Sequence, residues 1–316
     1  NKMKKKEKIL ITGGAGYLGS MITTYLVYQG YEVTVIDKLI YSKNSLTHLF
    51  AYSNFSLVID DVTKKKIILN HLKNKDIIIP LAALVGAPLC EKNKKLATKL
   101  NVKVIENICH NLKKKQKIIF LTTNSGYGVG EKKKYCDETS SLRPVSYYGK
   151  TKNQAEEIIR KRGNQISFRL ATVFGFSFRM RTDLLVNFMV LQAFKRKKIK
   201  IFEPHFRRNF VHILDVVKAI HFSILNFKRL KNNVFNLGLS NANITKLQLL
   251  KKIKRKINKF KIIIDDTKKD PDQRDYFVSN KKIEKKGFKA SISLEKGIEE
   301  LVDIYSLDNT NFKNNY

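Results

Sequence analysis

The first forty residues hold the feature that most restricts the fold of this chain. A short apolar run, KILIT at 8–12, leads directly into the glycine-rich stretch GGAGYLG at 13–19, and an apolar helical segment follows to about Gln29. The stretch YEVTVID at 31–37 then alternates as a strand does and ends on an acid. This order predicts a strand, a helix and a second strand that form one βαβ unit.

The glycines at 13, 16 and 19 give this turn a chemical meaning. Gly13 permits a tight turn, Gly16 lets the backbone approach a pyrophosphate, and the N-terminus of the following helix offers free amides to the anion. Asp37 could bind both hydroxyls of an adenosine ribose and would repel a 2′-phosphate. The pattern predicts a dinucleotide site that prefers NAD to NADP, and an ordinary glycine turn is the alternative.

More strands are predicted further along the chain, with helix-sized segments between them. They lie at 56–59, 76–83, 117–123 and 166–173. Strands that alternate with helices are typical of a parallel sheet that is covered on both faces. We therefore expect an α/β protein with a doubly wound, Rossmann-type parallel sheet and a smaller C-terminal substrate-binding domain.

The pattern of elements changes after about Val173. Helices are predicted at 182–195, 213–227 and 245–257, and short strands near 199–202 and 234–237. We expect a Rossmann domain over residues 1–173 with a return segment at about 206–240. Residues 174–205 and 241–316 are expected to form a cap that binds the substrate.

The chain is strongly basic, with 62 Lys+Arg against 27 Asp+Glu and a formal net charge of +35. The lysines fall in short runs along the whole chain instead of collecting in one arm or helix. Most of this charge is therefore interpreted as a solvated surface that concentrates anionic substrates, with no specific nucleic-acid partner. A basic nucleic-acid-binding protein that senses NAD is the alternative that the charge suggests.

Three cysteines, Cys90, Cys109 and Cys136, are too few and too widely spaced for a disulfide framework or a zinc ribbon. This spacing favours a reducing compartment and predicts no metal site. The apolar run at 9–11 stops at Gly13, far short of a signal-peptide core or a membrane span. A soluble, cytoplasmic protein without a membrane partner is expected.

The stretch VSYYGKTK at 145–152 places Tyr148 four residues before Lys152. Residues at this spacing lie one turn apart on the same face of a helix. Taken alone, the pair fits an amphipathic helix with a half-buried tyrosine and a solvated lysine. The preceding dinucleotide motif favours a second interpretation, because a neighbouring ammonium lowers the pKa of a phenol.

Five motifs follow one another in the chain. They are GGAGYLG at 13–19, TTNSGYG at 122–128, the Tyr148 and Lys152 pair, RLATVFG at 169–175 and RRNFVHILD at 207–215. In order and spacing they resemble the extended short-chain dehydrogenase/reductase family, which contains nucleotide-sugar epimerases, dehydratases and dehydrogenases. The resemblance covers nearly the whole chain and implies an NAD-dependent enzyme that acts on a nucleotide sugar.

The resemblance also implies roles for individual residues. Tyr148 is similar to the catalytic base of the family, Lys152 to the residue that lowers the pKa of that base and holds the nicotinamide ribose, and Thr123 to the hydroxyl partner of the reacting oxygen. A tyrosine starts from a pKa of ~10, so the neighbouring cation would help it to lose its proton near neutral pH. Further residues expected at the cofactor are Tyr17, Leu18, Asp61, Val62, Leu81, Ala82 and Ala83.

The expected substrate contacts follow from the same resemblance. Guanidinium groups suit phosphate oxygens, and the candidates to hold a nucleotide diphosphate are Arg179, Arg181, Asn187, Arg208 and Arg274. Helices at about 93–111 and 147–163 commonly pair into a dimer interface in this family, so a homodimer is expected.

Asn124 and Ser125 narrow the reaction. Family members that dehydrate at C4 and C6 have an Asp-Glu pair at these positions, and members that epimerise at C5 commonly have a cysteine at the second one. Neither residue here is an acid or base of suitable pKa. Both residues are therefore expected to contact the substrate without transferring protons. Dehydration and C5 epimerisation are disfavoured, and redox chemistry at C4 is the reaction that remains.

The runs IIIPLAALVGAPLC at 77–90 and DPDQRDY at 270–276 are most similar to those of GDP-heptose 4-dehydrogenases of bacterial capsule pathways. This likeness implies oxidation of GDP-D-glycero-D-manno-heptose to its 4-keto form, for capsule or surface polysaccharide synthesis. A nucleotide-sugar 4-epimerase, similar to UDP-glucose 4-epimerase, is the alternative, because both reactions begin with the same hydride transfer.

Overall fold

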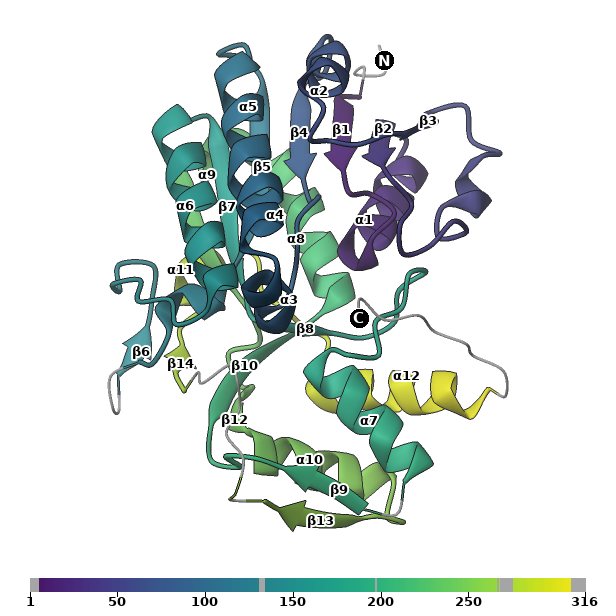
Figure 1. Cartoon of the computed structure of the whole chain (residues 1–316), viewed down its shortest axis with the longest axis vertical. Coiled ribbons are helices and arrows are strands. Elements are labelled where there is room, and N and C mark those ends of the chain that lie inside the picture. The colour runs from purple at the N-terminus through teal and green to yellow at the C-terminus, as the bar shows by residue number, and fades with distance from the viewer. Residues whose placement is uncertain (1–5, 131–133, 197, 266, 268–274, 308–316) are drawn as a thin grey trace.

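The computed structural model describes residues 6–130, 134–196, 198–265, 267 and 275–307 (Figure 1). Its centre is a seven-stranded parallel sheet with the order β11-β7-β5-β4-β1-β2-β3. These strands are β1 (Lys8–Thr12), β2 (Glu32–Asp37), β3 (Phe55–Ile59), β4 (Ile77–Pro80), β5 (Lys117–Thr123), β7 (Gln165–Leu170) and β11 (Asn233–Leu237). The predicted doubly wound α/β fold is confirmed.

Helices cover both faces of this sheet. Helices α1 (Tyr17–Tyr28) and α8 (Ile213–Leu225) pack together on one face. The other face carries α2 (Lys65–Leu72), α4 (Lys94–Thr98), a π-helical turn (Lys99–Lys103), α5 (Val104–Asn111) and α6 (Tyr147–Arg162). Side chains alternate along β1, so Ile9 and Ile11 lie in the core beside α1 and α8, while Leu10 lies in the core beside α2 and α5.

A second group of elements follows β7. It contains β8 (Thr172–Phe174), α7 (Leu185–Lys195), β9 (Lys198–Ile201), β10 (Arg207–His212), β12 (Asn243–Thr245), α10 (Lys246–Lys256), β13 (Lys261–Ile264) and α12 (Leu294–Ser306). Strand β10 pairs with β8 and β12, and β13 pairs with β9. Figure 1 shows these elements below the main sheet.

Short elements complete the described part of the chain. They are η1 (Thr47–Leu49), α3 (Ala87–Lys92), η3 (Asn124–Tyr127), β6 (Tyr135–Cys136), α9 (Phe227–Leu230), β14 (Phe277–Val278) and α11 (Lys281–Lys285). Strand β14 pairs with β6. In the same ranges, no helix has the length and apolar character that crossing a membrane requires.

The strand expected at 166–173 is two strands in different sheets, so the prediction of one strand was wrong. The amide of Ala171 donates to the carbonyl of Leu237 at 2.9 Å, which continues the pairing of β7 with β11. From Thr172 onward the chain pairs with Phe210 of β10 instead. The strand expected at 76–83 is also shorter than predicted, because only Ile77–Pro80 pairs as a strand.

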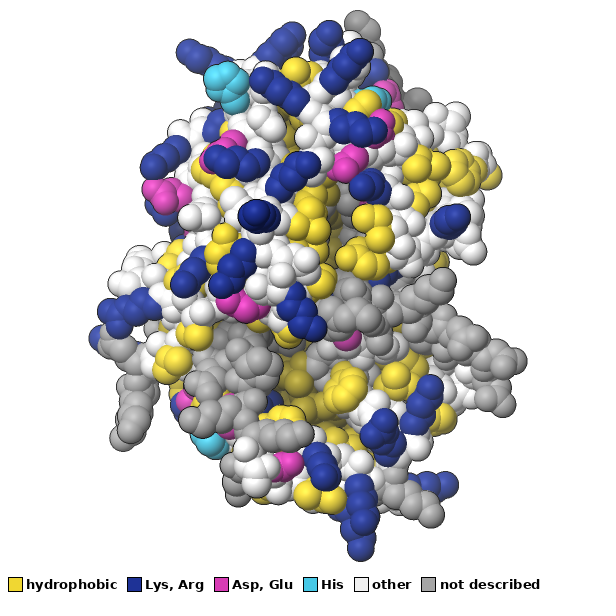
Figure 2. Space-filling model, in the orientation of Figure 1, with side chains coloured by type: hydrophobic (Ala, Val, Ile, Leu, Met, Phe, Trp, Pro, Cys, Tyr) yellow, Lys and Arg dark blue, Asp and Glu magenta, His cyan; other side chains and the backbone are white. Residues whose placement is uncertain are grey.

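The basic side chains on the face shown in Figure 2 are widely spread. Lys and Arg side chains are scattered over this face, with uncharged and apolar side chains between them. On this face the distribution is typical of a solvated basic surface, and it differs from a single basic stripe that follows a nucleic-acid backbone.

Candidate active site

A cavity of about 370 Å³ lies at the carboxyl ends of the central strands. Open parallel sheets bind their ligands at this edge, where the strand order reverses. The structure brings together at this cavity the residues that the sequence assigns to the cofactor: Gly13, Gly16, Tyr17, Leu18, Gly19, Asp37, Asp61, Val62, Leu81, Ala82, Ala83 and Lys152. Tyr148, Arg179 and Arg181 line the same cavity.

The glycine turn is shaped by close backbone contacts. Gly13 has a φ of +73°, and a Cβ added there would lie 2.5 Å from the amide nitrogen of Ala82. A Cβ at Gly19 would lie 2.2 Å from the carbonyl oxygen of Gly13. A Cβ at Gly16 would approach only that oxygen, at 3.3 Å. The first and third glycines therefore serve the packing of the turn, and the middle one leaves backbone open at the cavity wall.

Two carboxylates stand at the ends of neighbouring strands β2 and β3. Asp37 accepts hydrogen bonds from the amides of Ala15 at 3.0 Å and Leu39 at 2.8 Å, which fix its orientation. Asp61 is partly desolvated, which raises its pKa, but hydrogen bonds from Thr63 and Lys38 outweigh this effect and lower the pKa to about 2. An open glycine turn beside these acids suits a dinucleotide with an adenosine ribose.

Tyr148 and Lys152 lie on the first turns of α6. The hydroxyl of Ser146 caps this helix by accepting from the amide of Gly149 at 3.2 Å. Tyr148 is half-buried and Lys152 is buried, with its Nζ 4.3 Å from the centroid of the Phe120 ring. Burial lowers the pKa of Lys152 to about 8. The lysine therefore stays cationic at neutral pH while its charge is poorly solvated.

Thr123 is the last residue of β5 and does not line the cavity, whereas its neighbour Thr122 does. The hydroxyl of Thr123 accepts from the amide of Ser125 at 3.1 Å and donates to the hydroxyl of Ser125 at 2.9 Å. Asn124 is 1% exposed, and its side-chain oxygen and nitrogen have no hydrogen-bond partner within the described residues. Leaving a buried amide unsatisfied is costly, so this residue is poised for a polar partner.

The two arginines at the cavity lie close in sequence and in space. The guanidinium of Arg179 lies 4.7 Å from the centroid of the Tyr41 ring, and Arg181 forms a two-point ion pair with Asp183. Burial lowers the pKa of Arg179, and the positive charge of Arg181 lowers it further. A second anion at this end of the cavity would relieve that repulsion.

Two further candidates for substrate binding, Asn187 and Arg208, do not line this cavity. Asn187 is 0% exposed, and its amide group bonds to the backbone of Gly175 and to the carbonyl of Arg181 at 2.9 Å. It therefore positions the segment that carries Arg181 and does not line the cavity, and its contact with the substrate stays a prediction. Arg208 is also buried, and it donates to the carbonyl of Arg207 at 2.9 Å. Arg274 lies outside the described residues.

The structure also shows cavity features that the sequence analysis missed. Asn101 lies in the π-helical turn, accepts from the amide of Leu84 at 2.8 Å and donates to the hydroxyl of Thr151 at 3.0 Å. It thereby ties the cavity wall to α6. Lys38 and Tyr41 also line the cavity. A loop position and a buried amide on a helix carry no local pattern that would have indicated these roles.

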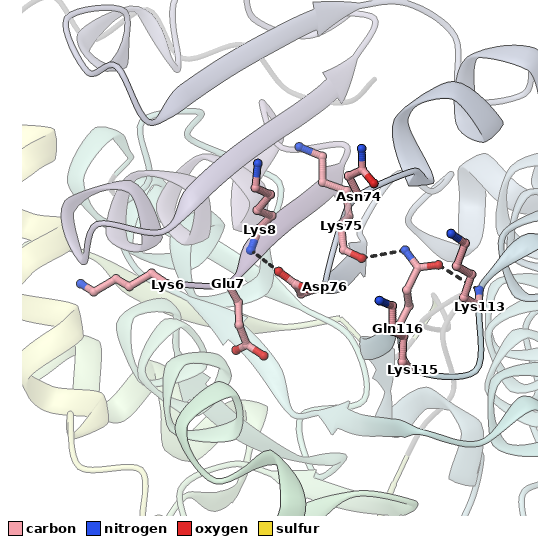
Figure 3. Close-up of a pocket in the computed structure, with 9 residues that line it drawn as sticks. All are labelled: Lys6, Glu7, Lys8, Asn74, Lys75, Asp76, Lys113, Lys115 and Gln116. Carbon is pink, nitrogen blue, oxygen red and sulfur yellow. Dashed lines mark hydrogen bonds between the residues drawn. The ribbon is translucent and has the colours of Figure 1, made fainter. Parts of the chain in front are cut away.

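A second cavity, of about 460 Å³, lies at the opposite edge of the sheet and is lined by Lys6, Glu7, Lys8, Asn74, Lys75, Asp76, Lys113, Lys115 and Gln116 (Figure 3). Figure 3 shows that the lysine side chains spread apart instead of converging. Lys8 pairs with Glu32 at 2.9 Å, and Lys75 donates to the hydroxyl of Thr34 at 2.6 Å. These internal pairs fit a polar surface groove, and the first cavity is therefore the candidate active site.

A parallel sheet with this glycine turn and an acid at the end of the second strand defines a Rossmann-type dinucleotide-binding protein. The family model described as the NAD dependent epimerase/dehydratase family matches residues 9–238. The chain belongs to this family, and it is accordingly an NAD-dependent enzyme of the nucleotide-sugar epimerase/dehydratase class.

Similar proteins span nearly the whole chain. A putative UDP-glucose 4-epimerase of Methanocaldococcus jannaschii is 27% identical and matches 93% of this chain and 97% of its own length. The dTDP-D-glucose 4,6-dehydratase of Mus musculus is 26% identical, with 98% and 91% covered. A solved UDP-glucuronic acid 4-epimerase from Bacillus cereus is 23% identical, with 95% and 99% covered and a TM-score of 0.83, a likeness that shows the fold.

Proposed function

We propose that this enzyme oxidises C4 of a nucleotide sugar, with GDP-D-glycero-D-manno-heptose as substrate and its 4-keto form as product. Such a product would serve capsule or surface polysaccharide synthesis. The observation that carries the proposal is the position of Tyr148 and Lys152 in the wall of the same cavity as the glycine turn.

In the proposed reaction, Tyr148 accepts the proton of the C4 hydroxyl while the C4 hydrogen leaves as hydride and a C4 carbonyl forms. NAD bound in the cavity supplies the hydride acceptor. Lys152 favours the phenolate form of Tyr148, because a cation in a poorly solvated site lowers the pKa of a neighbouring phenol. Thr123 stands at the end of β5, and its hydroxyl would turn from Ser125 to the reacting oxygen when substrate is present.

Two arginines in the cavity wall support a nucleotide diphosphate. Arg179 and Arg181 line the cavity, and Arg181 pairs with Asp183. Guanidinium groups bind phosphate oxygens through paired N–H donors. Tyr41, which covers Arg179, would flank the same diphosphate.

Asn124 and Ser125 support redox chemistry at one carbon. Elimination of water from a sugar needs an acid and a base of suitable pKa beside the carbon chain. An amide and a hydroxyl do not supply them, but both can hydrogen-bond sugar hydroxyls. The unsatisfied amide of Asn124 is the group that a sugar hydroxyl would satisfy.

A nucleotide-sugar 4-epimerase is the second candidate function. The relative from Methanocaldococcus jannaschii, named a putative UDP-glucose 4-epimerase, favours it. The same residues would begin both reactions, because an epimerase differs only in returning the hydride to the other face of the ketone.

Absorbance at 340 nm tests these alternatives, with stoichiometric protein, NAD, and a panel of GDP-, UDP-, dTDP- and CDP-sugars that includes a GDP-heptose. A lasting rise with GDP-heptose is expected. A new sugar epimer without a lasting rise would establish the epimerase instead. No reaction with any sugar would reject both.

Tyr148→Phe should lower turnover by a factor of about 10² to 10⁴ and leave NAD binding intact. Tyr147→Phe is the matched control, because the hydroxyl of Tyr147 bonds to that of Thr98 at 2.7 Å. Full activity of Tyr148→Phe would reject the assignment of the base.

We further propose that residues 1–173 and 206–240 form the cofactor domain and that 174–205 and 241–316 form the cap. The return of β11 to the main sheet supports this division, although β10 pairs with β8.

A homodimer through the helical segments at 93–111 and 147–163 is proposed as well; these segments contain α4, the π-helical turn, α5 and α6. Their outer faces carry the ion pairs Lys103–Glu106 and Glu157–Lys161. A monomeric mass in light scattering would contradict the dimer.

A further inference from the structure

A buried ion pair lies one helical turn beyond Lys152. Glu156 follows Lys152 by four residues on α6, so the two side chains share one face of the helix. The carboxylate of Glu156 accepts two hydrogen bonds from Arg169 of β7, from Nη2 at 2.7 Å and from Nε at 3.1 Å. The two side chains are 2% and 4% exposed. Both oxygens of Glu156 are therefore held by the guanidinium in a two-point pair.

Arg169 is also fixed from its other side. Its Nη1 donates to the hydroxyl of Tyr127 at 3.0 Å, and that hydroxyl donates to Oδ1 of Asn236 at 2.7 Å. This chain of hydrogen bonds joins β7, η3 and β11. The guanidinium is thus oriented toward Glu156 by groups that belong to three separate elements.

The surroundings of Lys152 show what this orientation achieves. Phe120 of β5 covers its ammonium, Tyr148 precedes it by one turn, and the thiol of Cys90 on α3 lies near it. Within the described residues, Glu156 is the carboxylate whose charge acts on Lys152. Without the hydrogen bonds from Arg169, the carboxylate of Glu156 would be free to pair with the ammonium of Lys152.

We propose that Arg169 withholds Glu156 from Lys152, so that the ammonium of Lys152 serves Tyr148 instead of forming an ion pair along α6. Arg169 is then a positioning residue that acts through Glu156. This inference rests on the roles proposed above for Tyr148 and Lys152.

The proposal predicts opposite effects for the two partners. Arg169→Gln leaves Glu156 to pair with Lys152 and should raise the pKa of Lys152 by about one unit or more. Glu156→Gln leaves the positive charge of Arg169 near Lys152 and should lower that pKa. The double variant E156Q/R169Q removes both charges and should titrate close to the wild type. An ion pair whose charges do not act on Lys152 would leave the pKa of Lys152 unchanged in both single variants.

The pH dependence of Lys152 acetylation by acetic anhydride, followed by peptide mass spectrometry on the full chain, measures this titration without any substrate. Lys150, exposed on the same helix, is the internal control. Slower acetylation of Lys152 in the presence of NAD would show that the reagent reaches Lys152 through the cavity.

Shifts of opposite sign in the single variants support the proposal. Unchanged midpoints, or shifts of the same sign, overturn it. If Arg169→Gln does not fold, Glu156→Gln and the double variant decide, and the absence of a downward shift in Glu156→Gln overturns the proposal. A wild type that turns over no sugar would reject the proposed function and leave this titration readable.

Discussion

Replacing Gly19 by alanine tests the close packing of the cofactor turn. The added Cβ would lie 2.2 Å from the carbonyl oxygen of Gly13 and 2.7 Å from the Cα of Gly14, roughly 1 Å inside ordinary contact distances. The contacted atoms are backbone, so they cannot rotate away as a side chain would. Over-packing of this kind costs about 3 kcal/mol at the upper end of its usual range.

Part of this cost is offset, because Gly19 lies inside α1. Alanine is favoured over glycine in a helix by about 1 kcal/mol. The net loss is therefore about 2 kcal/mol, which corresponds to a fall in Tm of about 3 °C for a chain of this size. Thermal unfolding followed by circular dichroism, without added NAD, measures this loss.

Gly16→Ala is the matched control in the same turn. Its Cβ would contact only the carbonyl oxygen of Gly13, at 3.3 Å, and its φ of −76° suits alanine. This variant should unfold within about 1 °C of the wild type, yet bind NAD about tenfold more weakly because the methyl group occupies the cavity wall, a loss of about 1.4 kcal/mol. An unchanged Tm for Gly19→Ala, or equal stability losses in both variants, would refute the reasoning.

Three further predictions concern other parts of the molecule. Burial lowers the pKa of Lys152 from 10.5 to about 8. Between these two pH values the unfolded chain binds more protons than the folded chain, so this lysine makes the free energy of unfolding rise with pH. Lys152→Met should raise the urea midpoint at pH 7 and flatten the rise of stability with pH, and an unchanged pH slope would contradict the pKa shift. Asp37→Ser should weaken NAD binding about tenfold or more in calorimetry, since hydrogen bonds to a charged group are worth about 1.5–3 kcal/mol. Equal affinity of the variant and the wild type would contradict a contact between Asp37 and the ribose. Thr245→Ala breaks the reciprocal cap with Gln248 at the start of α10 and should cost about 1 kcal/mol. This loss should appear as a fall in Tm of about 1–2 °C, and wild-type stability would contradict the cap.

Local patterns in the sequence were sufficient for much of the fold. The apolar run before the glycine turn and the run at 117–123 form β1 and β5 with the predicted bounds. Helix α12 was missed although its signal is present. Ser293 caps it by accepting from the amide of Lys296 at 3.2 Å, and its buried residues, Leu294, Ile298, Leu301 and Tyr305, recur at helical spacing.

Contacts between distant segments explain the remaining errors. The change of sheet at Ala171 depends on where Leu237 and Phe210 lie, and no pattern around Ala171 shows this. In the candidate site too, features set by local spacing could be predicted and contacts between distant segments could not. The glycine turn and the Tyr148 and Lys152 pair could be predicted, because spacing along one helix or turn determines them. The contact of Tyr41 with Arg179 could not be predicted, because it joins segments that are far apart in sequence.

The position of β11 at the edge of the main sheet has a consequence for biosynthesis. The edge of β7 that faces away from β5 has no partner until Asn233–Leu237 has been synthesised, about sixty residues after Leu170. At about 5–20 residues per second, this interval lasts on the order of 3–12 s. During this interval, the nascent chain presents an open strand edge that can pair with other chains, and the arrival of β11 covers that edge.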